Sequence, residues 1–350
     1  MVIEWGTFLS ELMASPMLVA VTLLNIGVII VNGATDAPNA IATVVSTRCM
    51  KPGAAIVMAA IANFLGLLFI TLISSAVAKT IFHMVDFGGN SHQALIALLA
   101  AMVAIIVWGA TAWYFGIPTS QSHSLIAGIT GAAIALQGGF SGINWAEWMK
   151  VIYGIALSTF LGFGTGWLCA RLVSIIFRRF DRTKLNKGFT WAQILAGAGV
   201  AFMHGAQDGQ KFMGIFILAI TLATGIGQVD QLNLPVWLMI FCALNMGIGT
   251  AAGGKKIIKS VGMEMVKLEK YQGFAVSTSS VICLFISTFA GLPVSTTHTS
   301  TTSIMGVGAE KNPKAVKWSV AGEMVKTWIL TFPGCGLLGY VVAQIFFMIL

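Results

Sequence analysis

The sequence predicts an all-α polytopic membrane protein, built from two inverted-topology repeats with broken helices and helical hairpins. Three observations lead to this fold class: a low content of charged residues, a series of long apolar runs, and two short motifs that each occur twice. Of the 350 residues, 57% are hydrophobic and 9% are charged, whereas soluble globular domains carry about 25% charged residues. So few charged side chains cannot cover a water-exposed surface, and we expect most of the surface to face a lipid bilayer.

The apolar runs are long enough to cross a membrane, since one crossing uses roughly 20 apolar residues. Backbone exposed to lipid must satisfy its own hydrogen bonds, and the runs show no strand-like alternation, so we expect helices. In the first half the runs are Met17 to Val45, Ala54 to Ala78, Ala94 to Phe115, Ser124 to Leu136 and Trp145 to Phe177. In the second half they are Trp191 to Gly225, Leu234 to Ala252, Gly273 to Ala290, Thr299 to Gly308 and Trp318 to Leu350.

Two motifs recur in the same order in both halves. Gly33-Ala34-Thr35-Asp36 matches Gly205-Ala206-Gln207-Asp208, and Gly116-Ile117-Pro118-Thr119-Ser120-Gln121-Ser122-His123 matches Gly291-Leu292-Pro293-Val294-Ser295-Thr296-Thr297-His298. Both matches have nearly the same separation, which indicates duplication of a unit of about 175 residues. We therefore expect a first transmembrane repeat at residues 1–177, a basic cytoplasmic linker at 178–190 and a second, inverted repeat at 191–350.

The distribution of basic residues predicts how the two repeats are oriented. If each proline-containing motif folds its neighbouring runs into a hairpin, each repeat crosses the membrane three times and the second copy is inverted. Most of the 20 Lys and Arg residues, including those of the central linker, then lie on one side. The positive-inside rule makes that side cytoplasmic and places both termini outside. We expect a multi-pass protein of the cell (plasma) membrane; the basic residues set topology, so no nucleic-acid partner is expected.

Asp36 and Asp208 are charged residues within apolar runs, at matching positions of the two repeats. Each such charge costs at least about 2.5–3.5 kcal/mol on insertion scales, which calls for pairing or a function. Carboxylate, hydroxyl and carbonyl oxygens replace water around a small hard cation, so the pair predicts cation or proton sites. The alternative is that helix neighbours satisfy both carboxylates. Pro38 removes a backbone donor, and we expect the first helix to be broken near Asp36.

The neighbours of these acids on the same helix face are also polar. Asn32 and Asn39 share a face with Asp36, as His204 and Lys211 do with Asp208. For Lys211, two roles remain open: neutralising Asp208 in an internal ion pair, or attracting an anionic substrate. His204 is either a hydrogen-bonded structural residue or a proton carrier.

The second motif predicts an anion site at two hairpin tips. Each tip places five consecutive polar residues before a helix start: Ser120, Gln121, Ser122, His123 and Ser124 in one, Ser295, Thr296, Thr297, His298 and Thr299 in the other. Hydroxyl donors and free helix N-terminal amides favour negative charge, and helix capping explains only one hydroxyl per tip.

Cation and anion sites together predict a coupled anion transporter that works by alternating access, and not an enzyme. An intramembrane hydrolase is disfavoured, because no GxSxG or HExxH motif occurs and the duplication supplies two equivalent sets of residues. A passive anion channel also uses donor-lined tips, but it gains nothing from two buried carboxylates.

These motifs resemble those of the inorganic phosphate transporter (PiT) family, whose repeats each carry a GANDxxN-like and a PxSxTH-like motif. Here they read GATDAPN and GAQDGQK, then PTSQSH and PVSTTH. The resemblance implies an inverted-repeat secondary transporter that performs symport of inorganic phosphate with sodium ions or protons. It assigns Asp36, Asn39 and Asp208 to cation sites, and it assigns Ser120, Ser122, Ser295, Thr296 and Thr297 to the phosphate site. Transport of sulfate or another oxyanion by the same fold is the alternative.

The sequence departs from the family pattern in both motifs, and in the first tip Gln121 and Ser122 replace the commoner hydroxyl pair. Thr35 and Gln207 replace the asparagine before each aspartate, and Lys211 replaces the last asparagine of the second motif. We expect Thr35, Asn32 and Gln207 to add to the cation sites, with sodium a candidate at Asp36 and Asp208, and Lys211 and Gln121 to add to the phosphate site.

A lysine near Asp208 would repel a cation, so the two acids are not expected to bind cations equally. The expected partners are inorganic phosphate, the coupling cation and the lipid bilayer. No other cofactor is expected, and a homo-oligomer is left open.

Overall fold

A computed structural model describes residues 4–88, 90–115, 119–225, 234–252 and 268–350. Apart from one isolated β-bridge between Val85 and Ile143, the regular structure of these residues is helical. Six of the described helical segments are long and apolar enough to cross a membrane. The predicted all-α membrane fold is thus confirmed. Parts of two expected features, at 116–118 in the first tip motif and at 253–267 among the basic residues, lie outside the described residues.

The helices follow one another with few irregular connections. The first half contains α1 (Trp5–Ala14), α2 (Pro16–Thr35), α3 (Ala37–Ser46), α4 (Pro52–Ile73), α5 (Ala76–Phe82), α6 (Ser91–Phe115), α7 (Gln121–Gln137), α8 (Trp145–Ala156) and α9 (Gly162–Phe177). A π-helical segment, Leu157–Leu161, joins α8 to α9. The second half contains α10 (Arg182–Thr224), α11 (Val236–Ala252), α13 (Lys270–Phe289), α14 (Thr296–Lys311) and α15 (Trp318–Ile349).

The predicted break at Asp36 is present, but the second repeat has no counterpart. Helix α2 ends at Thr35 and α3 begins at Ala37, so Asp36 lies between them. In contrast, α10 continues through Asp208 for 43 residues. The position equivalent to Pro38 is Gln210, which retains a backbone N–H, so the helix is not interrupted there.

The run expected from Ala54 to Ala78 is divided into two helices, α4 and α5. The side chain of Gln210 accounts for this second difference from the prediction. Its amide nitrogen donates to the Ser74 carbonyl at 2.7 Å, and its amide oxygen accepts from the backbone N–H of Val77 at 3.2 Å. These side-chain bonds satisfy backbone groups that the helix leaves unpaired at the break.

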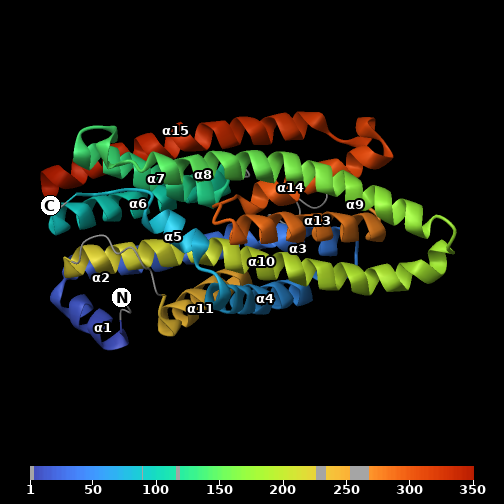
Figure 1. Cartoon of the computed structure of the whole chain (residues 1–350), viewed down its shortest axis with the longest axis horizontal. Helices are drawn as coiled ribbons and strands as arrows, with labels where there is room; N and C mark the ends of the chain where they lie inside the picture. Colours follow the sequence, from blue (N-terminus) through green and yellow to red (C-terminus); the bar gives the residue numbers. More distant parts are fainter. Residues whose placement is uncertain (1–3, 89, 116–118, 226–233, 253–267) are drawn as a thin grey trace.

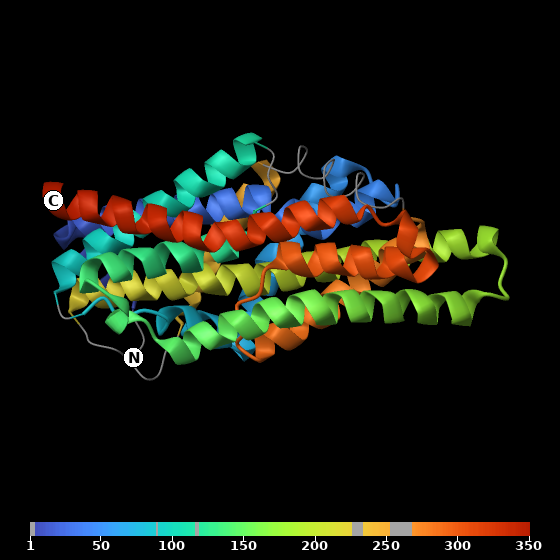
Figure 2. The ribbon, with the colours of Figure 1, turned by 90° about the horizontal axis from the view of Figure 1, so that it is seen from above.

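Two helical hairpins lie toward opposite ends of the molecule's long axis. Helices α6 and α7 lie in the half that holds both termini, and α13 and α14 lie in the half with the turn between α9 and α10 (Figure 1). The view from above shows both termini at the end opposite that turn (Figure 2). The basic linker and the two termini therefore lie at opposite ends of the molecule, and the inversion of the second repeat stays a prediction.

Equivalent helices of the two halves make equivalent contacts. Helix α7 packs on α15 as α14 packs on α9, and α4 packs on α10 as α11 packs on α2. Glycines allow close approach at these crossings: a Cβ at Gly131 would collide with the Gly336 carbonyl, and one at Gly66 with the Phe202 carbonyl. In lipid, such small residues let helix backbones approach closely enough for strong van der Waals packing. The crossings hold the hairpin tips against the middle of α10.

Candidate functional site

Asp36 and Asp208 lie close together, although 172 positions separate them in the chain. Both side chains are buried, Asp36 at the break between α2 and α3 and Asp208 in the middle of α10. The side-chain nitrogen of Asn32 lies 3.5 Å from Asp36 Oδ2 and 3.2 Å from Asp208 Oδ2. A single amide therefore bridges the acids of the two repeats, and a charge bound at one acid acts directly on the other.

Asp208 forms an ion pair with Lys211 inside the protein. Lys211 Nζ lies 2.7 Å from Asp208 Oδ1, and both side chains are fully buried. The same nitrogen donates to Ser122 Oγ and to the Val294 carbonyl, each at 2.6 Å. An ammonium has three N–H donors, and all three are used here. A contact between Lys211 and phosphate therefore requires one of these bonds to open.

His204 packs against the same acid. Its Nδ1 lies 3.0 Å from Asn63 Oδ1, and its Nε2 lies 3.3 Å from Asp208 Oδ2. Asn63 in turn donates to Thr250 Oγ1 on α11 at 3.1 Å. This chain of contacts links α4, α10 and α11, and it favours a hydrogen-bonded structural role for His204.

Asp36 has a different set of neighbours. Thr35 Oγ1 lies 3.4 Å from Asp36 Oδ1, and among the described residues no lysine, arginine or histidine forms an ion pair with Asp36. The side-chain oxygens of Asn32 and Asn39 are buried without a hydrogen-bond partner in the described structure. Carboxylate, hydroxyl and amide oxygens are the ligands that hard cations prefer. The surroundings of Asp36 thus fit a cation that the protein does not itself supply.

The two hairpin tips begin with equivalent helix caps. Ser120 accepts from the His123 backbone N–H at the start of α7, and Ser295 accepts from the His298 N–H at the start of α14. Ser, Thr, Asn and Asp are preferred at this position because their side chains satisfy a free amide. The hydroxyls of Ser120 and Ser295 are therefore engaged at their own helix starts.

The residues after each cap reach the central acids. Ser122 Oγ lies 3.4 Å from Asp208 Oδ1, and Thr296 Oγ1 lies 3.5 Å from Asp208 Oδ2. Thr297 Oγ1 accepts from the side chain of Asn39 at 2.8 Å. Hydroxyls of both tips and acids of both repeats form one buried cluster, which is what the two motifs predict when read together.

Gln207 and Gln121 are predicted binding residues, but their side-chain amides form no hydrogen bond with Asp36 or Asp208 in the described structure. Gln207 donates to the Leu292 carbonyl at 2.7 Å and accepts from Thr288 Oγ1 at 3.4 Å, so its amide ties α10 to the second hairpin. The amide group of Gln121 is buried and has no hydrogen-bond partner in the described part of the chain. The binding roles assigned to both residues stay predictions.

The histidines that end the tip motifs form a contact that sequence reasoning did not assign. The rings of His123 and His298 meet edge to face, with centroids 4.4 Å apart, and His298 stacks on Trp328. The hairpins of the two repeats therefore touch directly. Their equivalent positions in the motif pair are the signal that could have suggested this contact.

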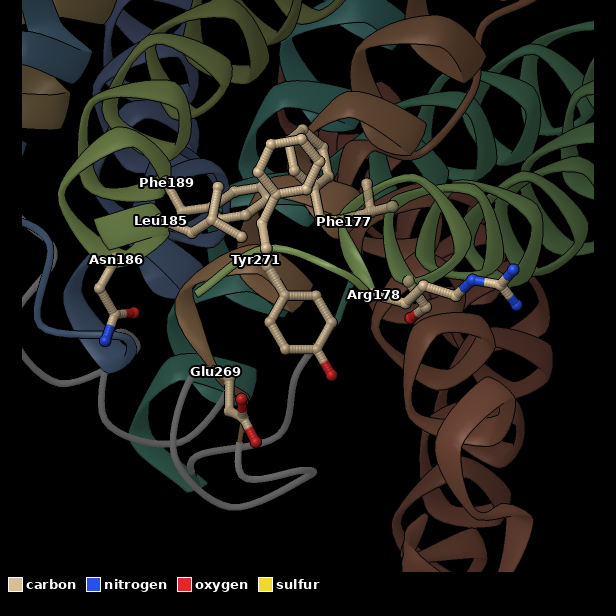
Figure 3. A pocket seen from close by; sticks show the side chains of 10 residues that line it. Phe177, Arg178, Leu185, Asn186, Phe189, Glu269 and Tyr271 are labelled. Carbon is tan, nitrogen blue, oxygen red and sulfur yellow. The ribbon is translucent and has the colours of Figure 1, made fainter. Parts of the chain in front are cut away.

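A separate cavity lies away from the cluster. Its volume is about 270 Å³, and its lining includes Phe177, Leu185, Phe189 and Tyr271, beside the turn between α9 and α10 (Figure 3). None of the predicted site residues lines it. The cavity is therefore separate from the predicted binding residues.

Comparison with known proteins gives one consistent result. The model of the phosphate transporter family matches residues 32–339. A probable low-affinity inorganic phosphate transporter of Bacillus subtilis (strain 168) is 38% identical over 319 residues, which cover 91% of this chain and 94% of that protein. A protein of the same description from Rhizobium meliloti (strain 1021) is 36% identical over 327 residues, 93% of this chain and 95% of the relative.

A solved structure shares the fold. It is described as a sodium-dependent phosphate transporter, and it matches with a TM-score of 0.88 over 96% of this chain and all of that one, at 21% sequence identity. The region matched by the family model, residues 32–339, contains both tips and both acids of the buried cluster.

Proposed function

Because this chain belongs to the phosphate transporter family, we propose that it is a secondary active transporter that moves inorganic phosphate with sodium ions or protons by alternating access. The observation that carries the proposal is the meeting of two hairpin tips, one from each repeat, at the buried acids Asp36 and Asp208. The structural neighbour is a sodium-dependent phosphate transporter, which supports sodium as a coupling ion.

Phosphate binds between the tips in this proposal. The hydroxyls of Ser122, Thr296 and Thr297 donate to its oxygens, and the first amides of α7 and α14 add donors whose helix dipoles favour an anion. Ser120, Gln121 and Ser295 complete the polar surface around it. Phosphate replaces the contacts that Ser122 makes with Asp208 and Lys211 and the contact that Thr296 makes with Asp208.

The coupling of phosphate binding to cation binding follows from the negative charges in the site. Phosphate carries up to two negative charges, and placing it beside two carboxylates in a low-dielectric interior is prohibitive unless cations are present. A cation at Asp36 offsets this repulsion, so phosphate binds tightly only after the cation is in place. The two hairpins lie toward opposite ends of the molecule (Figure 1). Displacement of one hairpin at a time opens the site to one side at a time.

The direct test is uptake of labelled phosphate by proteoliposomes containing the purified protein. We expect uptake to accelerate when an inward sodium or proton gradient is imposed, and to be faster for phosphate than for labelled sulfate. Sulfate is added as a competitor to rank the two anions. An uptake rate that does not change with either gradient would identify a passive channel. Faster uptake of sulfate than of phosphate would identify an oxyanion permease of the same fold.

Removal of one tip hydroxyl should weaken phosphate binding. We expect Thr297→Ala to raise the phosphate concentration for half-maximal uptake by about 10- to 100-fold, because a hydrogen bond to a charged group contributes about 1.5–3 kcal/mol. Thr297→Ser keeps the hydroxyl and should retain the wild-type value. Thr301→Ala, one turn further along α14, is the matched control. The same phosphate concentration for half-maximal uptake in all three variants would show that Thr297 does not bind phosphate.

A further inference from the structure

The two repeats differ in charge at the position three residues after their acids. Asn39 lies three residues after Asp36, and Lys211 lies three residues after Asp208. The Lys211 ammonium is held by three oxygens at 2.6–2.7 Å: a carboxylate of Asp208, the hydroxyl of Ser122 and the backbone carbonyl of Val294. The first repeat has no ammonium at the equivalent place.

We propose that Lys211 is a tethered substitute for a coupling cation in the second repeat, so that only Asp36 recruits a cation from solution. The transport cycle then moves one positive charge fewer per phosphate than it would with two free cation sites. This inference rests on the proposed function and specifies how many cations that function uses.

The oxygens around Lys211 form the first support. Carboxylate, hydroxyl and backbone carbonyl oxygens are the ligands with which proteins surround small hard cations. An ammonium is a compact point charge with three donors, and each donor here points to one of these oxygens. Asp208 is therefore already paired with a positive charge, which belongs to a side chain and cannot leave the protein.

The contrast with Asp36 forms the second support. In the described part of the chain, Asp36 forms no ion pair, and the amide oxygens of Asn32 and Asn39 beside it lack hydrogen-bond partners. Two carboxylates and one ammonium leave one unbalanced negative charge in a buried cluster. A single cation neutralises that charge, and Asp36 is the place with oxygens still free to hold it.

The position of Lys211 adds a third argument. Ser122 belongs to α7 in the first hairpin, and Val294 directly precedes the cap of α14 in the second. The ammonium thus bridges the two hairpins as well as neutralising Asp208. A free cation could leave with the substrate, whereas the tethered charge stays in the protein and is ready to rejoin the hairpins in each cycle.

The decisive variant is Lys211→Asn, which gives the second repeat the residue found in the first. We expect this variant to move one additional positive charge per phosphate, measured as the shift in reversal potential of proteoliposomes under a fixed phosphate gradient. Lys150→Asn is the matched control, because Lys150 also pairs with an acid three residues away, at 2.7 Å, but is partly exposed and outside the cluster. Its charge per phosphate should equal that of wild type.

A second measurement does not depend on transport. Purified Lys211→Asn should gain thermal stability when sodium replaces choline at constant ionic strength, or when the pH is lowered, by more than wild type does. The double variant Asp208→Asn/Lys211→Asn has no carboxylate at position 208, so it should lose the extra stabilisation by sodium or low pH that Lys211→Asn gains.

The outcomes separate this inference from the proposed function. An unchanged charge per phosphate in Lys211→Asn overturns the inference, as does a folding defect that neither sodium nor protons relieve. A wild-type protein that takes up no phosphate under any gradient overturns the proposed function itself.

Discussion

Asp36→Asn is expected to abolish cation-coupled phosphate uptake, lowering its initial rate by more than about 100-fold. Asp36 is buried and forms no ion pair among the described residues, so it is the acid that can take a cation from solution. Loss of one partner of a buried charge pair costs about 3–5 kcal/mol, and each 1.4 kcal/mol is about a tenfold change in binding. The measurement is labelled phosphate uptake into proteoliposomes under inward sodium and proton gradients.

The control for this variant is Asp181→Asn, which removes an exposed carboxylate between α9 and α10. Its uptake should match wild type. Size-exclusion chromatography of both variants separates a loss of transport from a loss of folding. Wild-type uptake by a folded Asp36→Asn protein would show that the cation binds elsewhere.

Asp208→Asn is expected to destabilise the folded protein by about 3–5 kcal/mol, because it leaves the Lys211 ammonium buried without its counter-charge. Both side chains are fully buried, and their atoms lie 2.7 Å apart. The free energy of unfolding in mixed micelles provides the measurement. The double variant Asp208→Asn/Lys211→Asn should recover much of the loss, since removing both charges of a buried pair is often close to neutral.

Glu147→Gln supplies a matched comparison. Glu147 and Lys150 have the same spacing and the same 2.7 Å separation, but the two side chains are 17% and 38% exposed. Exposed pairs contribute about 0–1 kcal/mol, so this variant should lose less than about 1 kcal/mol. Equal losses in Asp208→Asn and Glu147→Gln would show that burial does not set the strength of the Asp208 pair.

Much of the architecture could be predicted because its signals are local in the sequence. Apolar runs identify the membrane helices, and the repeated proline motifs identify the two hairpins. The break at Asp36 followed from Pro38, and its absence at Asp208 followed from the glutamine at position 210, which sequence analysis did not weigh. Helix α1 was missed, because its ten residues include Glu11 and precede the first long apolar run.

The sequence by itself determined which groups must be buried and which of them are neighbours on one helix. Helical periodicity places Lys211 and His204 on the face of Asp208, because residues three and four apart share a face. It carries no information about contacts between helices. Only the packing of helices from both repeats places Asn32 between the two acids. The same packing brings Ser122 and Val294 into contact with the Lys211 ammonium.

That packing sets the three contacts of Lys211 in this structure, and its role toward the substrate stays a prediction. A buried ammonium is costly unless its donors are hydrogen-bonded, so its three donors pair with the oxygens that the fold brings within reach. The sequence supplied the charge and one partner three residues away. The tertiary structure supplied the other two partners, one from each hairpin, and so turned a local ion pair into a bridge between the repeats.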